Sequence, residues 1–245
     1  MDHTDHNRAF WDADAAAYQD AHGAALTHAP MAWGAYRIPE SDVSVLGDVR
    51  DATVLELGCG AAQWSIALAA LGTSVVGLDV SAAQLGYARE ADPKLALTLA
   101  DGERLPYCAR AFDVVFCDHG ALSFCEPDVI LGECARVLRA GGLLAFCCTH
   151  PLLYLTWDEE RQRQTRRLQI RQDQLGRMEL GEGTIDWVLT ASEWIGLLRR
   201  HDFAVDGCIE LCAPRDATTT YEEYAPPKWA RKWPAEWIWK ARRIG

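Results

Sequence analysis

Glycines and acidic residues follow three consecutive strand-like runs in the first half of the chain. The run Val54–Leu57 leads directly into Gly58-Cys59-Gly60, and the next two runs close with Asp79 and Asp101. Glycines allow the backbone to approach a ligand closely, and the helix that follows offers free amide groups. A carboxylate about twenty residues beyond such a turn can accept hydrogen bonds from both hydroxyls of a ribose. The pattern predicts a nucleoside-containing cofactor at three adjacent strand ends.

Two cofactor classes fit a ribose-binding acid behind a glycine turn. Dinucleotide enzymes use Gly-x-Gly-x-x-Gly, and this chain has Gln63 at the position of the third glycine. A pyrophosphate would also lie among Glu56, Asp79 and Asp101, whose charges would repel it. S-adenosylmethionine carries a sulfonium and an ammonium, and an acidic crevice stabilises cations. The residues therefore favour S-adenosylmethionine and leave an NAD-dependent dehydrogenase as the alternative.

Further motifs extend the pattern from Thr53 to Leu144. They are the Glu-x-Gly-x-Gly turn at Glu56, Gly58 and Gly60, the acids Asp79 and Asp101, Leu105-Pro106 with Phe112-Asp113-Val114-Val115, and Arg136-Val137-Leu138-Arg139-Ala140-Gly141-Gly142. Together they resemble the class I methyltransferases, particularly the small-molecule branch that includes the ubiquinone and menaquinone biosynthesis enzymes. The resemblance implies a Rossmann-like α/β sandwich of three layers with a seven-stranded, mostly parallel sheet. In that family the last strand is antiparallel and inserted beside the fifth.

The resemblance also implies a set of residues around S-adenosylmethionine. These are Tyr18, Trp33, Glu56, Gly58, Cys59, Gly60, Gln63, Asp79, Val80, Asp101, Gly102, Asp118 and His119. Asp79 would hold the ribose, Asp101 would accept from the adenine amino group, and Glu56 would orient the loop and the methionine amino group. Tyr18 and Trp33 would belong to an N-terminal lid over the methionine, although core packing explains them equally well.

Two histidines are candidate catalytic bases, because ligands bind beyond the strand ends of open α/β sheets. His119 follows the fourth strand and His150 follows the fifth. A base is needed only if the acceptor must lose a proton. The ring of His150 is expected to project toward the sulfonium, whereas His119 is expected to lie nearer the cofactor. No metal is expected, because Cys208 and Cys212 have no partner pair nearby.

Alternation of apolar runs with helical stretches predicts a parallel sheet with crossover helices. Strands are expected at 53–57, 74–78, 95–100, 112–117, 143–148, 204–211 and 236–242, and helices at 8–20, 32–46, 63–71, 82–90, 127–138 and 192–201. One domain, 1–245, would comprise an N-terminal helical lid (1–48), a cofactor-binding core (49–150), a helical inserted cap (151–190) and a C-terminal helix with two strands (191–245).

Composition limits the partners. The net charge of −11 disfavours nucleic acid, and the basic stretches Arg161–Arg171 and Lys228–Lys232 are expected to be solvated helix faces. No long uncharged apolar run is present, so we expect a cytoplasmic protein with no membrane partner and with reduced, buried thiols. The acceptor is expected to be a small hydrophobic or aromatic metabolite, with Trp33, Trp157 and Trp187 as a substrate wall. The protein would be a monomer or homodimer, and a non-catalytic cofactor-binding protein remains an alternative.

Overall fold

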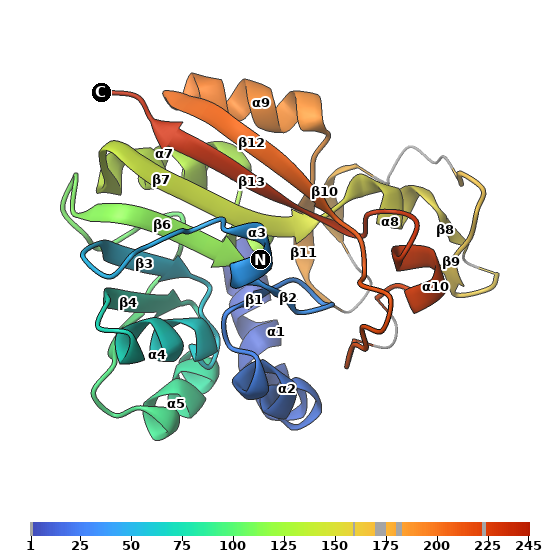
Figure 1. The fold of residues 1–245 in the computed structure, drawn as a ribbon, viewed down its shortest axis with the longest axis horizontal. Helices are drawn as coiled ribbons and strands as arrows, with labels where there is room; N and C mark the ends of the chain where they lie inside the picture. Colours follow the sequence, from blue (N-terminus) through green and yellow to red (C-terminus); the bar gives the residue numbers. More distant parts are fainter. Residues whose placement is uncertain (1, 159, 170–174, 180–182, 222–223) are drawn as a thin grey trace.

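A seven-stranded sheet forms the centre of the molecule, in a computed structural model that describes residues 2–158, 160–169, 175–179, 183–221 and 224–245 (Figure 1). The strands are β3 (Thr53–Leu57), β4 (Ser74–Asp79), β5 (Ala96–Leu99), β6 (Phe112–Asp118), β7 (Leu138–Thr149), β12 (Phe203–Leu211) and β13 (Glu236–Arg243). Their order is β12-β13-β7-β6-β3-β4-β5. β13 is antiparallel to β12 and β7, and the other neighbours pair in parallel. The predicted topology, with the last strand inserted beside the fifth, is confirmed.

Helices cover both faces of this sheet and make the three expected layers. They are α4 (Gln63–Ala70), α5 (Ala82–Ala91), α6 (Ala121–Phe124), α7 (Pro127–Val137) and α9 (Ala191–Arg200). Successive side chains of a strand point to opposite faces. Accordingly, Val54 packs in one core with Leu68 of α4, and Leu55 packs in the other core with Ile130 of α7 and Leu198 of α9.

Local signals in the sequence explain where these helices begin and end. Thr190 and Glu193 form a reciprocal capping box at the start of α9. The Ser81 hydroxyl likewise accepts from the Gln84 amide at the start of α5. Helix α7 ends near the expected residue, but the chain enters β7 at once. The Gly141-Gly142 pair therefore lies within an irregular part of β7, where its register with β6 shifts.

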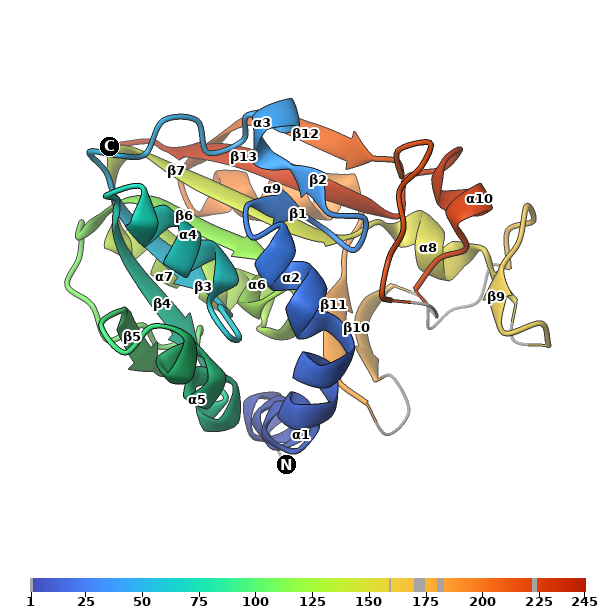
Figure 2. The ribbon, with the colours of Figure 1, turned by 60° about the horizontal axis from the view of Figure 1, so that its bottom comes forward.

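The N-terminal segment differs in part from the prediction. It contains α1 (His3–Tyr18), a π-helical turn (Gln19–Gly23), α2 (Ala24–His28), β1 (Ala32–Trp33), β2 (Ile38–Pro39) and α3 (Glu40–Val43). The first predicted helix is confirmed, whereas the second, at 32–46, is wrong. Gly34 and Arg37 have φ values of 69° and 52°, so the chain reverses there and β1 pairs with β2. Figure 2 shows α1 and α2 beside the ends of the central strands.

The inserted segment is also organised differently from the prediction. Its described residues form one short helix, α8 (Pro151–Leu155), and the strands β8 (Trp157–Asp158), β9 (Arg163–Gln164), β10 (Gly176–Glu179) and β11 (Ile185–Val188). These strands form two antiparallel hairpins, β8-β9 and β10-β11. The prediction of a helical cap is therefore wrong for the described part of the insertion. Its apolar residues lack a helical spacing, and its backbone groups are instead satisfied across hairpins.

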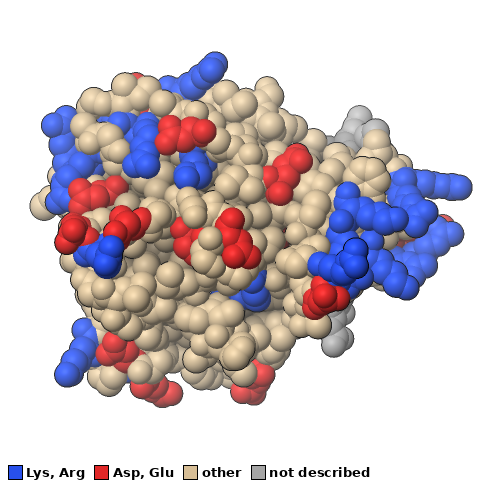
Figure 3. Space-filling model, viewed as in Figure 1, with Lys and Arg blue, Asp and Glu red and all other residues tan. Residues whose placement is uncertain are grey.

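In their described residues the basic stretches are solvated, as expected, but only Lys228–Lys232 is partly helical, and Arg171 lies outside the described residues. The exposed cations are Arg161, Arg163, Arg166, Arg167, Lys228, Arg231 and Lys232. Figure 3 shows Lys and Arg side chains gathered at the end of the molecule that carries β8, β9 and α10 (Pro227–Ala230). Within the described chain, no helix is long and apolar enough to cross a membrane.

The cysteines agree with the sequence interpretation in part. All nine are free thiols, and Cys59, Cys117, Cys147 and Cys148 are buried. Cys208 and Cys212 were expected to be buried and are exposed; Cys208 lies on β12, which is an edge strand of the sheet, and Cys212 follows that strand.

Candidate active site

A cavity of about 450 Å³ lies at the carboxyl ends of β3, β4, β5 and β6. Its floor is formed by the turns that follow these strands, including Gly58, Asp79, Asp101 and Asp118. Helix α1 contributes further lining residues, among them Trp11, and the view in Figure 2 shows α1 beside the strand ends. Parallel α/β sheets bind ligands in this position, so the topology itself places the candidate site.

Close backbone packing fixes the glycine turn after β3. Gly58 has a φ of 69°, and a Cβ built on it would lie 2.5 Å from the Ala121 amide nitrogen. A Cβ on Gly120 would lie 2.5 Å from the Leu57 carbonyl oxygen. The Gly58 amide also donates to the Leu78 carbonyl at 2.8 Å. Only glycine fits at these two positions, and the turn is therefore held against the neighbouring strand ends.

Asp79 closes β4 with its carboxylate directed at the glycine turn. One oxygen accepts from the Gly60 amide and the other accepts from the Ser81 amide, both at 2.8 Å. Burial raises the pKa of Asp79, and the backbone amides oppose this shift. Each carboxylate oxygen keeps further acceptor capacity for a ligand in the cavity.

Two other acids border the same cavity. Glu56 accepts from the Ser65 amide and hydroxyl, and burial raises the pKa of Glu56 to about 8. Asp101 accepts from the Glu103 amide at 2.9 Å, and burial raises its pKa as well. A cation placed beside these groups would favour their ionised forms, so this half of the cavity suits a positively charged ligand.

The end of β6 carries a second group of charges. His119 adopts a φ of 52°, and its Nε2 lies 2.7 Å from Oε1 of Glu236 on β13. Burial opposes protonation of His119, but the carboxylate of Glu236 raises its pKa above the ordinary value. Glu236 is 1% exposed and also accepts from the Ala35 amide at 2.7 Å. The two residues form a buried histidine–carboxylate pair at the cavity wall.

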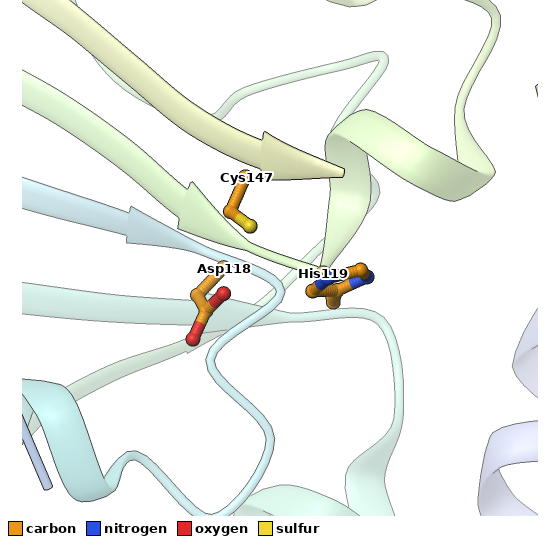
Figure 4. A group of neighbouring side chains, drawn as sticks. All are labelled: Asp118, His119 and Cys147. Atoms are coloured by element: carbon orange, nitrogen blue, oxygen red, sulfur yellow. The ribbon is translucent and has the colours of Figure 1, made fainter. Parts of the chain in front are cut away.

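Asp118, His119 and Cys147 also lie close enough to be considered as metal ligands. One potential ligand atom of each lies within 4.8 Å of the others (Figure 4). Burial raises the pKa of the Cys147 thiol well above its ordinary value. The Asp118 carboxylate already accepts from the Gly34 amide at 3.0 Å, and the Arg37 guanidinium lies 3.7 Å away.

The methyltransferase domain family matches residues 55–146, which contain the glycine turn and the three acids. Residues 55–146 form a methyltransferase domain. The match falls on the segment that the sequence predicts to bind S-adenosylmethionine.

Curated relatives cover part of the chain. A demethylmenaquinone methyltransferase of Streptomyces avermitilis is 32% identical over 134 residues, which are 54% of this chain and 56% of that protein. A malonyl-[acyl-carrier protein] O-methyltransferase of Hamiltonella defensa is 33% identical over 105 residues, which are 42% of this chain and 40% of that protein. The chain thus spans about half the length of the curated relatives it matches.

Solved structures share the fold over a larger share of the chain. An S-adenosylmethionine-dependent methyltransferase of Mesorhizobium loti has a TM-score of 0.67 and 24% identity, and covers 83% of this chain and 96% of its own. The magnesium protoporphyrin IX methyltransferase of Synechocystis, solved with bound SAH, has a TM-score of 0.64 and 16% identity over 99% of this chain and 100% of its own. At these identities the likeness establishes the fold.

Unpartnered polar atoms show that the cavity of the methyltransferase domain suits a polar ligand. Among the described residues, Arg37 Nε, Trp64 Nε1 and Ser123 Oγ are buried without a hydrogen-bond partner, and all three residues line the cavity. Buried donors left unpaired cost stability. The methionine carboxylate of S-adenosylmethionine is a suitable acceptor for the first two, and the acids suit its ammonium and sulfonium. The residues present therefore fit the cofactor.

Most residues predicted to bind the cofactor line this cavity. They are Tyr18, Glu56, Gly58, Cys59, Gly60, Gln63, Asp79, Val80, Asp101, Gly102, Asp118 and His119. Their contact with the cofactor remains a prediction. The prediction that Trp33 belongs to the lid over the cofactor is wrong, because its side chain is 0% exposed and packs against Trp64 and Phe116 in the core. Its Nε1 donates to Glu40 at 2.7 Å. The reversal at Gly34 turns Trp33 inward, so it does not form part of a lid.

The prediction that the His150 ring projects into the cavity is also wrong. Pro151 begins α8, and the His150 ring turns back to cap it, with Nδ1 accepting from the Leu152 amide at 3.1 Å. Nε2 lies 3.4 Å from a carboxylate oxygen of Glu210, and the ring packs on Trp237 at a centroid distance of 4.4 Å. His150 does not line the cavity, and burial lowers its pKa. Of the two histidines predicted as bases, His119 is the one that lines the cavity.

Sequence reasoning missed the other wall of the cavity. It is formed by Asn7, Phe10, Trp11, Arg37, Phe124, Thr149, Tyr154, Thr184, Asp186, Tyr221, Tyr224 and Glu236. Trp157 and Trp187, expected as a wall, do not line the cavity. The wall comes from segments without a family motif, and only the pair Tyr221 and Tyr224, near the aromatic C-terminal end, offered a signal. The Tyr221 hydroxyl lies 2.6 Å from that of Tyr18, which joins the C-terminal loop to α1.

Proposed function

We propose that this protein transfers the methyl group of S-adenosylmethionine to a small hydrophobic or aromatic molecule by in-line displacement. The observation that carries the proposal is one continuous cavity, with the acids Glu56, Asp79 and Asp101 on one side and aromatic side chains with His119 on the other. The curated relatives, a demethylmenaquinone methyltransferase among them, support a small acceptor. The alternatives of an NAD-dependent enzyme or a non-catalytic binding protein have no comparable support.

The cofactor supplies an activated methyl group, and the chain supplies its position. Asp79 would accept from the ribose hydroxyls and Asp101 from the adenine amino group. Glu56 would bind the methionine ammonium, while Arg37 and Trp64 would donate to the methionine carboxylate. Holding the acceptor and the methyl carbon in line in a dry pocket can supply much of the acceleration.

His119 is the base in this proposal, for an acceptor that must lose a proton. Glu236 lies 2.7 Å from Nε2 and would keep a proton on that nitrogen, which leaves Nδ1 as the basic atom. The pKa of His119 is raised above its ordinary value, and a higher pKa makes the imidazole a stronger base near neutral pH. We further propose that the protein works in a reducing compartment, as expected for the cytoplasm, because its nine cysteines are free.

The direct test is transfer of a labelled methyl group. The protein is incubated with methyl-labelled S-adenosylmethionine and a panel of small aromatic phenols, amines and enols, and the label is followed into the acceptor. We expect at least one acceptor to be labelled, with an equal amount of S-adenosylhomocysteine formed. Asp79→Ala is the matched control and should transfer little label at the same cofactor concentration. Cofactor binding without transfer to any acceptor would support the non-catalytic alternative instead.

A further inference from the structure

The wall of the cavity opposite the cofactor acids contains a compact group of polar and aromatic side chains. We call the space bordered by His119, Thr149, Tyr154, Asp186 and Tyr224 the acceptor chamber. The Tyr224 hydroxyl donates to the Thr149 hydroxyl at 3.1 Å, and the rings of Tyr224 and His119 lie 6.0 Å apart. Asp186 is close enough to His119 and to Tyr154 for its charge to affect both. These residues therefore face one common space.

The charges around the acceptor chamber do not balance. Asp118 faces the Arg37 guanidinium at 3.7 Å, and Glu236 faces His119 at 2.7 Å. Asp186 has no such partner: in the described part of the chain no basic group lies within ion-pair distance of it. Its carboxylate accepts a hydrogen bond from the Thr184 hydroxyl at 2.6 Å. A carboxylate in a largely buried position is costly unless a cation or further donors accompany it.

The chemical state of Asp186 is compatible with binding a cation. Burial raises its pKa to about 6, so the group is still mainly ionised at pH 7 to 8. A nearby positive charge would lower this pKa further. The aromatic rings of Tyr154 and Tyr224 offer electron-rich faces, which also attract ammonium groups.

We propose that the methyl acceptor carries a positively charged amine and that Asp186 binds this amine in the acceptor chamber, with Tyr154 and Tyr224 beside it. The proposal rests on the methyltransferase function above and adds the acceptor's chemical class. Asp186 acts here as a specificity-determining residue and takes no part in bond formation. An acceptor with a carboxylate in this position would meet Asp186, Glu236 and Asp118, and would be repelled.

The test uses three probes that share one ring and differ in charge: 2-phenylethylamine, 2-phenylethanol and phenylacetate. Each is titrated into the protein saturated with S-adenosylhomocysteine at pH 7.5. We expect the amine to bind at least about tenfold more tightly than the alcohol, and phenylacetate to bind most weakly. Asp186→Asn should remove the preference for the amine while keeping the affinity for S-adenosylhomocysteine and the melting temperature.

The matched control is Asp206→Asn, because Asp206 is an exposed acid on β12 that pairs with Arg242 at 3.0 Å. It should leave the preference for the amine unchanged. Equal affinity for the three probes, failure of the amine to bind, or a preference that survives in Asp186→Asn would overturn the proposal. Failure of the wild-type protein to bind S-adenosylhomocysteine would instead contradict the function on which the proposal rests.

Discussion

Replacing His119 by alanine is expected to lower the rate of methyl transfer by roughly 100- to 10,000-fold, or about 3 to 5 kcal/mol in the barrier. The reason is that His119 is the imidazole that lines the cavity beside a buried carboxylate, Glu236. The rate should be measured under single-turnover conditions at saturating cofactor, so that differences in cofactor binding do not affect the measured rate. In the wild type the rate should rise with pH through a pKa above 6.5, since the carboxylate raises the pKa of His119. This acidic limb should vanish in His119→Ala.

Two variants separate this role from a structural one. His150→Ala should keep close to the wild-type rate, because the His150 ring caps α8 and lies outside the cavity. Glu236→Gln should move the acidic limb to lower pH, since it removes the charge that favours protonated His119. If His119→Ala keeps more than about a tenth of the wild-type rate, positioning alone carries the reaction and the base assignment fails.

Trp33→Ala is expected to destabilise the protein by about 3 to 5 kcal/mol. The indole is fully buried, with ring centroids 5.0 Å from Trp64 and 6.1 Å from Phe116, and its loss would leave a large cavity. Glu40, which is 7% exposed, would also lose its indole donor. Equilibrium unfolding in denaturant measures the change in the free energy of unfolding.

The control for this prediction is Trp233→Ala. That side chain is 48% exposed, so its removal should change the free energy of unfolding by no more than about 0.5 kcal/mol. If Trp33→Ala left stability unchanged and weakened cofactor binding, Trp33 would belong to the cofactor site as the sequence suggested.

The sequence predicted the central fold well because its signals there are local. Val54–Leu57 is an apolar strand segment apart from Glu56, and it runs directly into Gly58, where the structure requires a glycine. Asp79 was predicted from a similar local signal, because it is the acid that ends the next strand. These features depend on neighbours in the chain, so spacing and residue type were sufficient.

The remaining features depend on contacts between distant segments. His150 does follow a strand end, but the direction of its ring is set by the cap of α8 and by packing on Trp237 of β13. The pairing of His119 with Glu236 requires β13 to be inserted beside β7, which brings a C-terminal residue to the site. Asp186 reaches the acceptor chamber through a hairpin, where the sequence suggested a helical cap. No local pattern encodes these arrangements.

Cofactor titration tests the central claim most directly, with the melting temperature as the readout. At a hundredfold excess over the dissociation constant, S-adenosylmethionine or S-adenosylhomocysteine should stabilise the protein by about 2.7 kcal/mol. For a chain of this size the melting temperature should rise by roughly 5 to 11 °C. Asp79→Ala, which loses the ribose acceptor, should weaken binding by roughly 2 to 4 kcal/mol and remove most of the shift at the same ligand concentration. A shift with NAD, or no shift with either methyl-cycle ligand at millimolar concentration, would contradict the account.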